Sequence, residues 1–345
     1  MIRFRFLPLI SCFLVVSCGG GGSSPNAPSD VTPSTYTLRG QTVSALDGRG
    51  IGRVNVKIGS QTATSDDGGT FELKNLQEGS GVLVVSGNTI IERQKTVTIP
   101  MAQLSREALI PATFDLNAFN EMFRGTGRLQ RWTSAPALVV LAKVMQFDQT
   151  STDDHYHATS EQLNDGDVAL MIEHLNEGLA LLTGNTFTAF SSVDVENPPS
   201  GKRLNTVRPG TIVIGSYRGV QSLANTIGFG RWATNGTPEV VGGSIYLDRN
   251  YDRANENRRL LRIHELGHAL GYLHVTVRSS IMNPAIGPEP SDFDRQAAAI
   301  AFQRMPGNQS PDSDVTEAPR ANTGGIFGSR SLARIAWSPP VICGP

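Results

Sequence analysis

Cysteine and histidine are scarce in this sequence, and neither sign of charge dominates. The chain has three cysteines and six histidines in 345 residues, with a formal net charge of −1. A charge so close to zero gives no reason to expect binding to nucleic acid. Long apolar runs are also lacking, because the apolar stretch at residues 6–16 is too short to span a bilayer as a helix. We therefore expect no nucleic-acid partner, and we interpret this stretch as a targeting segment.

The first 34 residues have the pattern of an exported, lipid-anchored protein. Basic residues precede the apolar stretch and a small residue follows it, which is typical of a signal peptide over residues 1–17. Residues 15–18, VVSC, resemble the lipobox of bacterial lipoproteins, and this resemblance implies that Cys18 becomes the acylated N-terminus. Residues 18–34 are rich in glycine, serine and proline and are expected to form a flexible tether. An ordinary signal peptide with an incidental cysteine is the alternative.

A lipidated Cys18 would hold the protein on a membrane of the bacterial cell envelope. Gly19 stands where an aspartate retains some bacterial lipoproteins at the inner membrane, which favours the outer membrane or the cell surface. Cys12 would leave with the signal peptide, so Cys343 would remain without a partner and no intramolecular disulfide is expected.

Residues 35–113 indicate a small all-β sandwich, because short alternating stretches are separated by turns. Strands are expected at residues 36–43, 54–58, 70–73, 82–85 and 96–99. The stretch resembles the carboxypeptidase regulatory-like domain through Gly40, Val43, Gly52, residues 54–56, 62–64, 66–68 and 71–73. That resemblance implies no catalysis, so we interpret the domain as a spacer or docking module.

The most informative stretch is residues 264–274, HELGHALGYLH, which holds half of the histidines. His264 and His268 are four residues apart, and on a helix such residues lie on one face, so both can reach a single ion. Glu265 lies one step round the helix, close enough to hold a water molecule without becoming a ligand. An amphipathic helix with incidental histidines is the alternative, and the demanding spacing disfavours it.

A straight helix would carry the third histidine, His274, away from the site. Gly271 can take a positive φ at no steric cost, so it can end the helix and turn the chain back. Three imidazoles with an open fourth position are typical of a catalytic zinc site rather than a structural one.

Residues 279–284 supply a second signature, in which Met282 can lie in a tight turn as an apolar floor beneath the ion. The two stretches together resemble the metzincin clan of zinc endopeptidases, whose pattern is H-E-x-x-H-x-x-G-x-x-H followed by a Met-turn. The resemblance implies Glu265 as the general base. It also implies one catalytic zinc ion with three ligands, His264, His268 and His274.

Residues 241–248, VGGSIYLD, are expected to form the strand before the active-site helix. Gly243, Ser244, Ile245 and Tyr246 resemble the matrixin stretch that runs antiparallel to bound substrate. An edge strand can bind an extended peptide by β-augmentation, and a plain edge strand is the alternative. Ser244 and Tyr246 stand where matrixins have an aspartate and a histidine for structural calcium and zinc, so only one zinc ion is expected.

Residues 114–305 are expected to form the catalytic domain. Helices are expected at residues 114–125, 160–182, 253–271 and 295–304, and strands at 137–144, 187–195, 211–215 and 241–248. Ser291 and Asp294 form an expected capping box for the last helix. The fold class is therefore multidomain: a small all-β sandwich, then an α/β (α+β) metzincin-like domain with a mixed, mostly parallel sheet and an active-site helix.

The C-terminal tail, the remaining cysteine and two further histidines are expected to have no catalytic or metal-binding role. Proline, glycine, serine and charge dominate residues 306–345, so a loosely ordered tail is expected. Some metzincins are kept latent by a cysteine, but Cys343 lacks the preceding arginine and lies at the opposite end of the chain, so we expect it to be incidental. His155 and His157 lie in a polar, loop-like stretch. We expect two exposed histidines there rather than a second metal site.

The resulting hypothesis is a secreted, lipid-anchored zinc endopeptidase that acts on proteins or peptides. Zinc on three neutral imidazoles would activate a water molecule and polarise the scissile carbonyl, with Glu265 as general base. Two alternatives stay open, namely hydrolysis of cell-wall peptide amides and a surface adhesin whose protease domain is inactive. The intact Glu265 disfavours the adhesin, since a degenerate domain has no chemical reason to keep it.

Overall fold

The structure is a computed structural model that describes residues 34–148, 150, 154–223, 225–254, 256–315 and 335–343. The expected signal peptide, Cys18 and all but the last residue of the expected tether lie outside these residues. Thr35–Pro345 form one compact unit. Among the described residues, no helix combines the length and the apolar character that a membrane span requires.

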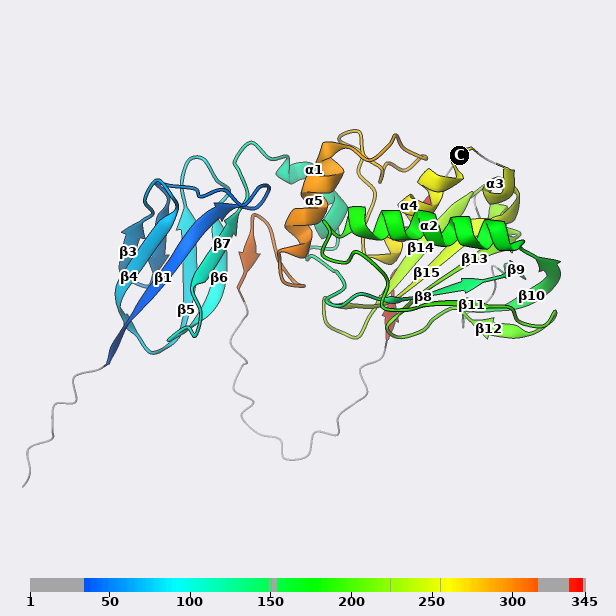
Figure 1. The fold of residues 1–345 in the computed structure, drawn as a ribbon, viewed down its shortest axis with the longest axis horizontal. Coiled ribbons are helices and arrows are strands. Elements are labelled where there is room, and N and C mark those ends of the chain that lie inside the picture. Colours follow the sequence, from blue (N-terminus) through cyan, green and yellow to red (C-terminus); the bar gives the residue numbers. More distant parts are fainter. Residues whose placement is uncertain are drawn as a thin grey trace, which may run out of the picture. The chain divides into compact units, whose positions relative to one another are not determined.

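The N-terminal part of this unit is a two-sheet sandwich (Figure 1). One sheet contains β1 (Thr35–Ser44), β4 (Thr70–Gln77) and β7 (Ser105–Leu109). The other contains β2 (Asn55–Ile58), β3 (Gln61–Thr64), β5 (Gly79–Ser86) and β6 (Arg93–Ile99). Leu38 and Phe71 from the first sheet share a core with Val56 and Val85 from the second, so the alternating residues pack between the sheets. All five expected strands are present, and β3 and β7 are additional.

The second part is built on one mixed sheet. Its strands are β8 (Ala137–Leu141), β9 (Lys143–Gln146), β10 (His155–Gln162), β11 (Val193–Glu196), β12 (Arg203–Asn205), β13 (Thr211–Arg218), β14 (Gly228–Thr234) and β15 (Val240–Asp248). The pairings of β11 with β8, β8 with β13, β9 with β13 and β13 with β15 are parallel. Pairings at both margins are antiparallel, so the expectation of a mostly parallel sheet is correct only for the centre.

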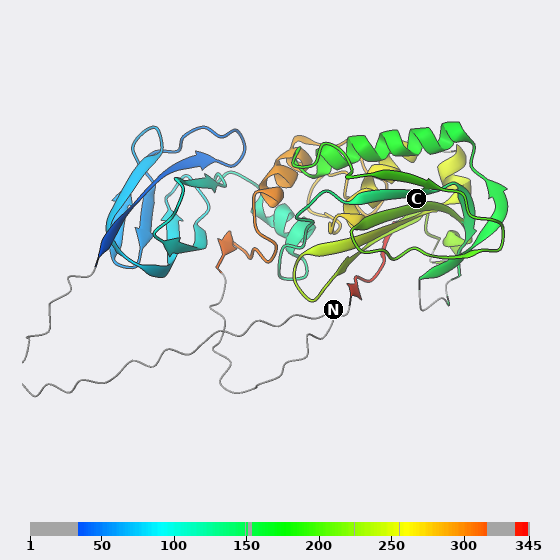
Figure 2. The ribbon, with the colours of Figure 1, turned by 60° about the horizontal axis from the view of Figure 1, so that its bottom comes forward.

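Helices α2 (Asp165–Leu182) and α4 (Arg258–Ala269) cover one face of this sheet (Figures 1 and 2). Leu175 of α2 and Leu266 of α4 pack in one core with Ile214 and Ile245 of the central strands. Helices α1 (Leu116–Arg124), α3 (Arg249–Ala254) and α5 (Asp292–Phe302) and the short 3-10 helix η1 (Val220–Ser222) complete the set. The sheet is therefore a rigid support that holds α4 in place.

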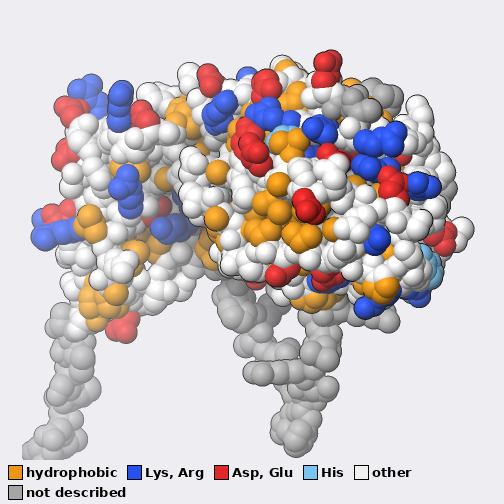
Figure 3. Space-filling view, turned by 45° about the vertical axis from the view of Figure 1, so that its right-hand side comes forward, with side chains coloured by type: hydrophobic (Ala, Val, Ile, Leu, Met, Phe, Trp, Pro, Cys, Tyr) orange, Lys and Arg blue, Asp and Glu red, His pale blue; other side chains and the backbone are white. Residues whose placement is uncertain are grey.

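The opposite face of the sheet carries an aromatic cluster. Tyr246 stacks on Phe229 with ring centroids 4.3 Å apart, and Tyr156 and Tyr217 meet it edge-on or tilted. These side chains are buried, so they stabilise the sheet. On the face of the molecule in Figure 3, acidic and basic side chains are interspersed, in keeping with the balanced net charge.

Several boundaries differ from the sequence expectation. The expected helix at 160–182 begins only at Asp165, because Asn164 caps it and the preceding residues pair in β10. That strand also places His155 and His157 in a sheet rather than in a loop. The expected strand at 137–144 is two strands, and the expected helix at 253–271 is α3 followed by α4.

Residues 306–345 were expected to be loosely ordered. The structure contradicts this for the described residues of this segment, which include three short strands. Short strand β16 (Ser313–Asp314) pairs with β6 of the sandwich. Strands β17 (Ala336–Trp337) and β18 (Val341–Cys343) pair with β14. Backbone pairing with partners distant in sequence orders these residues despite their polar and proline-rich composition.

Candidate metal centre

Helix α4 carries His264 and His268 on one face, as the four-residue spacing predicts. Gly271 follows the helix with φ 104°, and a Cβ at this position would lie 2.8 Å from the Gln130 carbonyl oxygen. Only glycine fits both demands, and the turn it makes brings His274 back to the helix. The Nε2 atom of His268 lies 3.0 Å from that of His264 and 3.2 Å from that of His274.

These separations suit three ligands of one zinc ion. With zinc–nitrogen bonds of ~2.0–2.1 Å, the nitrogens of a tetrahedral site lie about 3.3 Å apart. The Nδ1 atoms face carbonyl oxygens, Ile281 O at 2.6 Å for His264 and Tyr272 O at 2.8 Å for His268. A carbonyl oxygen accepts, so Nδ1 donates and Nε2 keeps its lone pair for a metal.

Met282 lies beneath the helix, where the Met-turn resemblance predicts an apolar floor. Its side chain is fully buried, and its Sδ atom would be 2.5 Å from a Cβ on Gly267 of α4. Glycine at 267 is therefore what lets the turn approach the helix. The preceding residue, Ile281, supplies the carbonyl that orients His264, so the turn supports the metal centre directly.

Glu265 is fully buried, and among the described residues neither carboxylate oxygen meets a hydrogen-bond partner. A Cβ on Gly228 would lie 2.9 Å from Glu265 Oε1, so the carboxylate packs against the bare backbone of β14. Burial raises the pKa of this carboxyl well above its usual range. A buried carboxylate without a cation is strongly unfavourable, which points to a missing positive charge at this place.

The residue that sequence reasoning missed is Cys343. Its Sγ atom lies 3.0 Å from His264 Nε2 and 3.6 Å from the Nε2 atoms of both His268 and His274. With a zinc–sulfur bond of ~2.3 Å, a tetrahedral site would have sulfur about 3.5 Å from each nitrogen. Cys343 is fully buried beside the three histidines, so the expectation of an incidental tail cysteine is wrong for this structure.

The four donors together fit zinc. They lie within 4.8 Å of one another and form the only such group of histidine, cysteine, aspartate and glutamate side chains that could hold a metal in the described part of the chain. Burial lowers the pKa of His264 to about 4 and lowers those of His268 and His274, so the imidazoles are neutral as ligands must be. Burial raises the pKa of the Cys343 thiol, so a bound zinc ion would have to displace its proton; three imidazoles and a thiolate are then a donor set that zinc prefers.

The expected substrate strand requires a correction. Gly243, Ser244, Ile245 and Tyr246 lie in β15, which pairs with β13 on one side and β14 on the other, so its backbone groups are already used. Apart from the short strands β17 and β18 of the C-terminal segment, β14 is the outer strand on this side, and it has no counterpart among the strands expected from the sequence. Its Gly-Phe-Gly sequence at 228–230 was the available signal, since alternate glycines in a strand mark close approach of another backbone.

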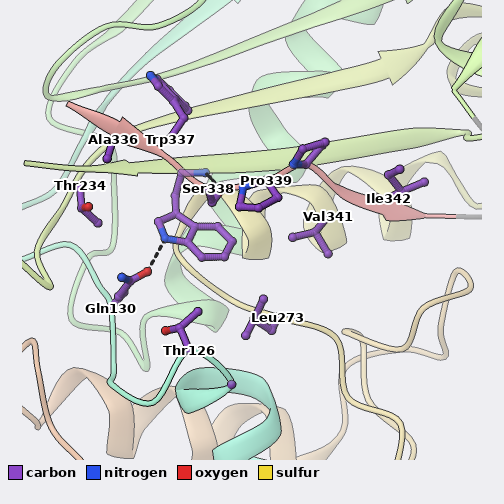
Figure 4. Close-up of a pocket in the computed structure, with 13 residues that line it drawn as sticks. Thr126, Gln130, Thr234, Leu273, Ala336, Trp337, Ser338, Pro339, Val341 and Ile342 are labelled. Carbon is purple, nitrogen blue, oxygen red and sulfur yellow. Dashed lines mark hydrogen bonds between the residues drawn. The ribbon is translucent and has the colours of Figure 1, made fainter. Parts of the chain in front are cut away.

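Next to β14 lies a cavity of about 620 Å³. Apolar side chains dominate its wall, among them Trp232 of β14, Leu273 beside the third histidine, and Trp337 and Val341 of the C-terminal segment (Figure 4). Trp232 donates from its indole nitrogen to Gln130 Oε1 at 2.6 Å, which fixes the ring as one wall. A cavity of this kind suits an apolar side chain of a ligand.

One family model matches a part of the chain that includes His264, His268 and His274. Residues 142–301 match the family model of matrixins, Peptidase_M10. This match supports a metzincin-like zinc protease domain here and a zinc metallopeptidase activity in general. No curated protein matches the chain.

Two solved structures with some similarity to part of this chain are mutants of the type II cohesin–X-dockerin complex from Acetivibrio cellulolyticus. The C-terminal interface mutant is 14% identical, with TM-score 0.18, over 22% of this chain and 56% of that chain. The N-terminal interface mutant is 16% identical, with TM-score 0.17, over 23% of this chain and 58% of that chain. The chain thus spans less than two thirds of each, and neither similarity is high enough to say anything about fold or function.

Proposed function

We infer that the protein is a zinc-dependent endopeptidase that cleaves peptide bonds in protein or peptide substrates. The observation that carries this inference is the convergence of three neutral imidazole nitrogens beside the unpartnered carboxylate of Glu265. A structural metal site would have no use for a buried carboxylate that is not a ligand.

The protein's own groups then have distinct tasks. His264, His268 and His274 would hold the zinc ion, which supplies a Lewis acid for the scissile carbonyl and for water. Glu265 would take a proton from the attacking water at a carboxylate oxygen and pass it to the leaving amine nitrogen. The apolar surroundings of the centre would exclude other solvent molecules.

The outer strand β14 would bind the substrate backbone. The C-terminal segment already pairs with this strand in antiparallel register, from Thr234 opposite Ala336 to Gly228 opposite Cys343. An extended peptide could make the same ladder and pass directly by the three imidazoles. The substrate-binding stretch is therefore Gly228–Thr234 rather than residues 243–246.

Replacing Glu265 tests this function. Glu265→Gln keeps the size of the side chain and removes the base, so cleavage of an unfolded protein should fall roughly 10²–10⁴-fold. Zinc content by metal analysis should stay at one ion per chain, because Glu265 is not a ligand. The assay is run in the natural chain and in the Cys343→Ser chain, with exposed Glu256→Gln as the matched control.

Equal cleavage by the Cys343→Ser protein with and without Glu265→Gln would refute the assigned base. Release of cell-wall fragments without cleavage of proteins would favour the amide-hydrolase alternative. Absence of both activities in a zinc-loaded protein would favour the adhesin.

We also infer an N-terminal lipid anchor on the cell envelope, supported by VVSC at residues 15–18 and the tether that follows. The natural chain should incorporate a palmitate analogue and fractionate with membranes, and Cys18→Ala should do neither. Incorporation of the label by Cys18→Ala would contradict the anchor.

A further inference from the structure

The described C-terminal residues, 335–343, lie along the same strand that a substrate needs. Ser338 N donates to Trp232 O at 2.8 Å, and Trp232 N donates to Ser338 Oγ at 3.1 Å. Arg231 packs over the Trp337 ring, 5.2 Å from its centroid. These contacts anchor the beginning of the segment on β14.

The end of the segment is anchored at the metal centre. Ile227 N donates to Cys343 O at 3.1 Å, so the carbonyl of Cys343 is engaged in the ladder. Its side chain instead faces the imidazoles, with Sγ 3.0 Å from His264 Nε2. The segment thus presents a sulfur atom, and not a peptide carbonyl, where a scissile bond would have to lie.

Two independent observations mark this as a ligand position. Cys343 Sγ lies at nearly tetrahedral separations from three nitrogen donors. The Glu265 carboxylate is fully buried and makes no hydrogen bond of ordinary geometry among the described residues, but the Cys343 thiol is near enough to interact with it as a weak donor. Sulfur, carboxylate and imidazoles therefore surround the same point.

We propose that residues 336–343 form a built-in inhibitor, in which Cys343 is the fourth metal ligand and the preceding residues cover the substrate-binding edge of β14. The inference rests on the proposed peptidase function and adds its regulation. Because inhibitor and substrate use the same strand and the same coordination position, they cannot bind together.

The covalent connection makes such an inhibitor effective. A tethered segment acts at an effective concentration of the order of millimolar, so even a weakly binding strand can outcompete dilute substrate. Pro339 and Pro340 separate β17 from β18 and provide no backbone N–H. The ladder on β14 is therefore interrupted, which allows the segment to leave without breaking a continuous strand pairing.

Metal ligation by Cys343 can be tested spectroscopically, without any assay of activity. The full-length protein is loaded with Co²⁺, and sulfur ligation should give an intense near-ultraviolet charge-transfer band. Cys343→Ser should lose this band and still bind one cobalt ion through the histidines. Ile342→Ala, a partly exposed neighbour on the same strand, should keep the band. Circular dichroism and thermal unfolding verify that each variant is folded.

Inhibition is tested on the same proteins with zinc. Cleavage of an unfolded protein should rise at least about tenfold in Cys343→Ser. This rise corresponds to a loss of ~1.4 kcal/mol in the free energy with which the segment binds the site. A second variant that ends at residue 315 lacks the whole segment and should be at least as active as Cys343→Ser. Ile335→Ala, at an exposed residue outside the proposed inhibitor, should resemble the natural chain.

The outcomes separate this inference from the proposed function. Absence of a sulfur band in the natural protein, or equal cleavage by the natural and Cys343→Ser proteins, overturns the inhibitor. If the band is present but no variant cleaves protein while binding zinc, Cys343 is a ligand of a non-peptidase site. That result refutes the proposed function, and with it the inhibitory role.

Discussion

Two glycines of strand β14 let helix α4 lie against it. A Cβ on Gly230 would fall 2.5 Å from His268 Cβ and 2.6 Å from the Glu265 carbonyl oxygen. Gly228 faces the Glu265 carboxylate in the same way. At the residue scale, the site therefore depends on side chains that are absent as well as on donors that are present.

Gly230→Ala should push α4 away from the strand. Since the colliding atoms are close to the backbone and cannot rotate away, we expect a loss of about 1–3 kcal/mol in the free energy of unfolding. Zinc affinity should fall as well, because His268 moves. Denaturant unfolding and a zinc titration measure both effects.

Gly68→Ala is the matched control for this change. A Cβ there meets nothing closer than Asp66 Oδ1 at 3.4 Å. Equal stability of the Gly230→Ala and natural proteins would show that β14 and α4 are not in the described contact.

The histidines and Glu265 were predictable because a helix converts their spacing into a shared position. Cys343 was not, since 69 positions separate it from His274 and no local pattern brings it there. The same reason explains the wrong substrate strand. A sequence indicates that a strand exists, but the order of strands in a sheet depends on long-range pairing.

At the element scale, the Met-turn is held by the first turn of α5. Asp294 accepts from Ser280 Oγ at 2.5 Å and from Ile281 N at 3.2 Å, and it completes the capping box with Ser291. The capping box was confirmed because it is a local sequence pattern. Its second use, to fix the turn whose carbonyl orients His264, appears only in the structure.

Asp294→Ala should therefore weaken two elements at once. Losing charge-assisted bonds to buried donors should cost roughly 2–3 kcal/mol in the free energy of unfolding. A displaced Ile281 carbonyl should lower zinc affinity about 10–100-fold. Thermal unfolding and competition with a chelator measure these changes.

The control is Asp292→Ala in the same helix turn. This aspartate is exposed and should contribute less than about 1 kcal/mol through the helix dipole. Identical zinc affinities in the two variants would mean that the cap does not support the metal centre.

At the scale of the whole molecule, a buried charge cluster joins the sandwich to the segment after α5. Asp312 is fully buried and bonds to Arg93 of β6 and to Arg304, which follows α5. Arg304 also donates to the Ala108 carbonyl in β7. These buried bonds hold the sandwich against the part of the chain that contains the three histidines, which a freely attached spacer would lack.

Asp312→Ala should leave two buried guanidinium groups with fewer partners. We expect the free energy of unfolding to fall by about 3–5 kcal/mol, the usual cost of removing one member of a buried ion pair. Differential scanning calorimetry measures it, with Asp47→Ala in an exposed turn as control. A change below ~1 kcal/mol would show that the two parts do not depend on this cluster.

We expect the three imidazoles to bind one zinc ion, and X-ray absorption spectroscopy of the zinc-loaded full-length protein tests this most directly. The spectrum should show three nitrogen scatterers at ~2.0–2.1 Å with imidazole outer-shell features, and one sulfur at ~2.3 Å that disappears in Cys343→Ser. A spectrum without imidazole scattering, or one unchanged by His268→Ala, would contradict it.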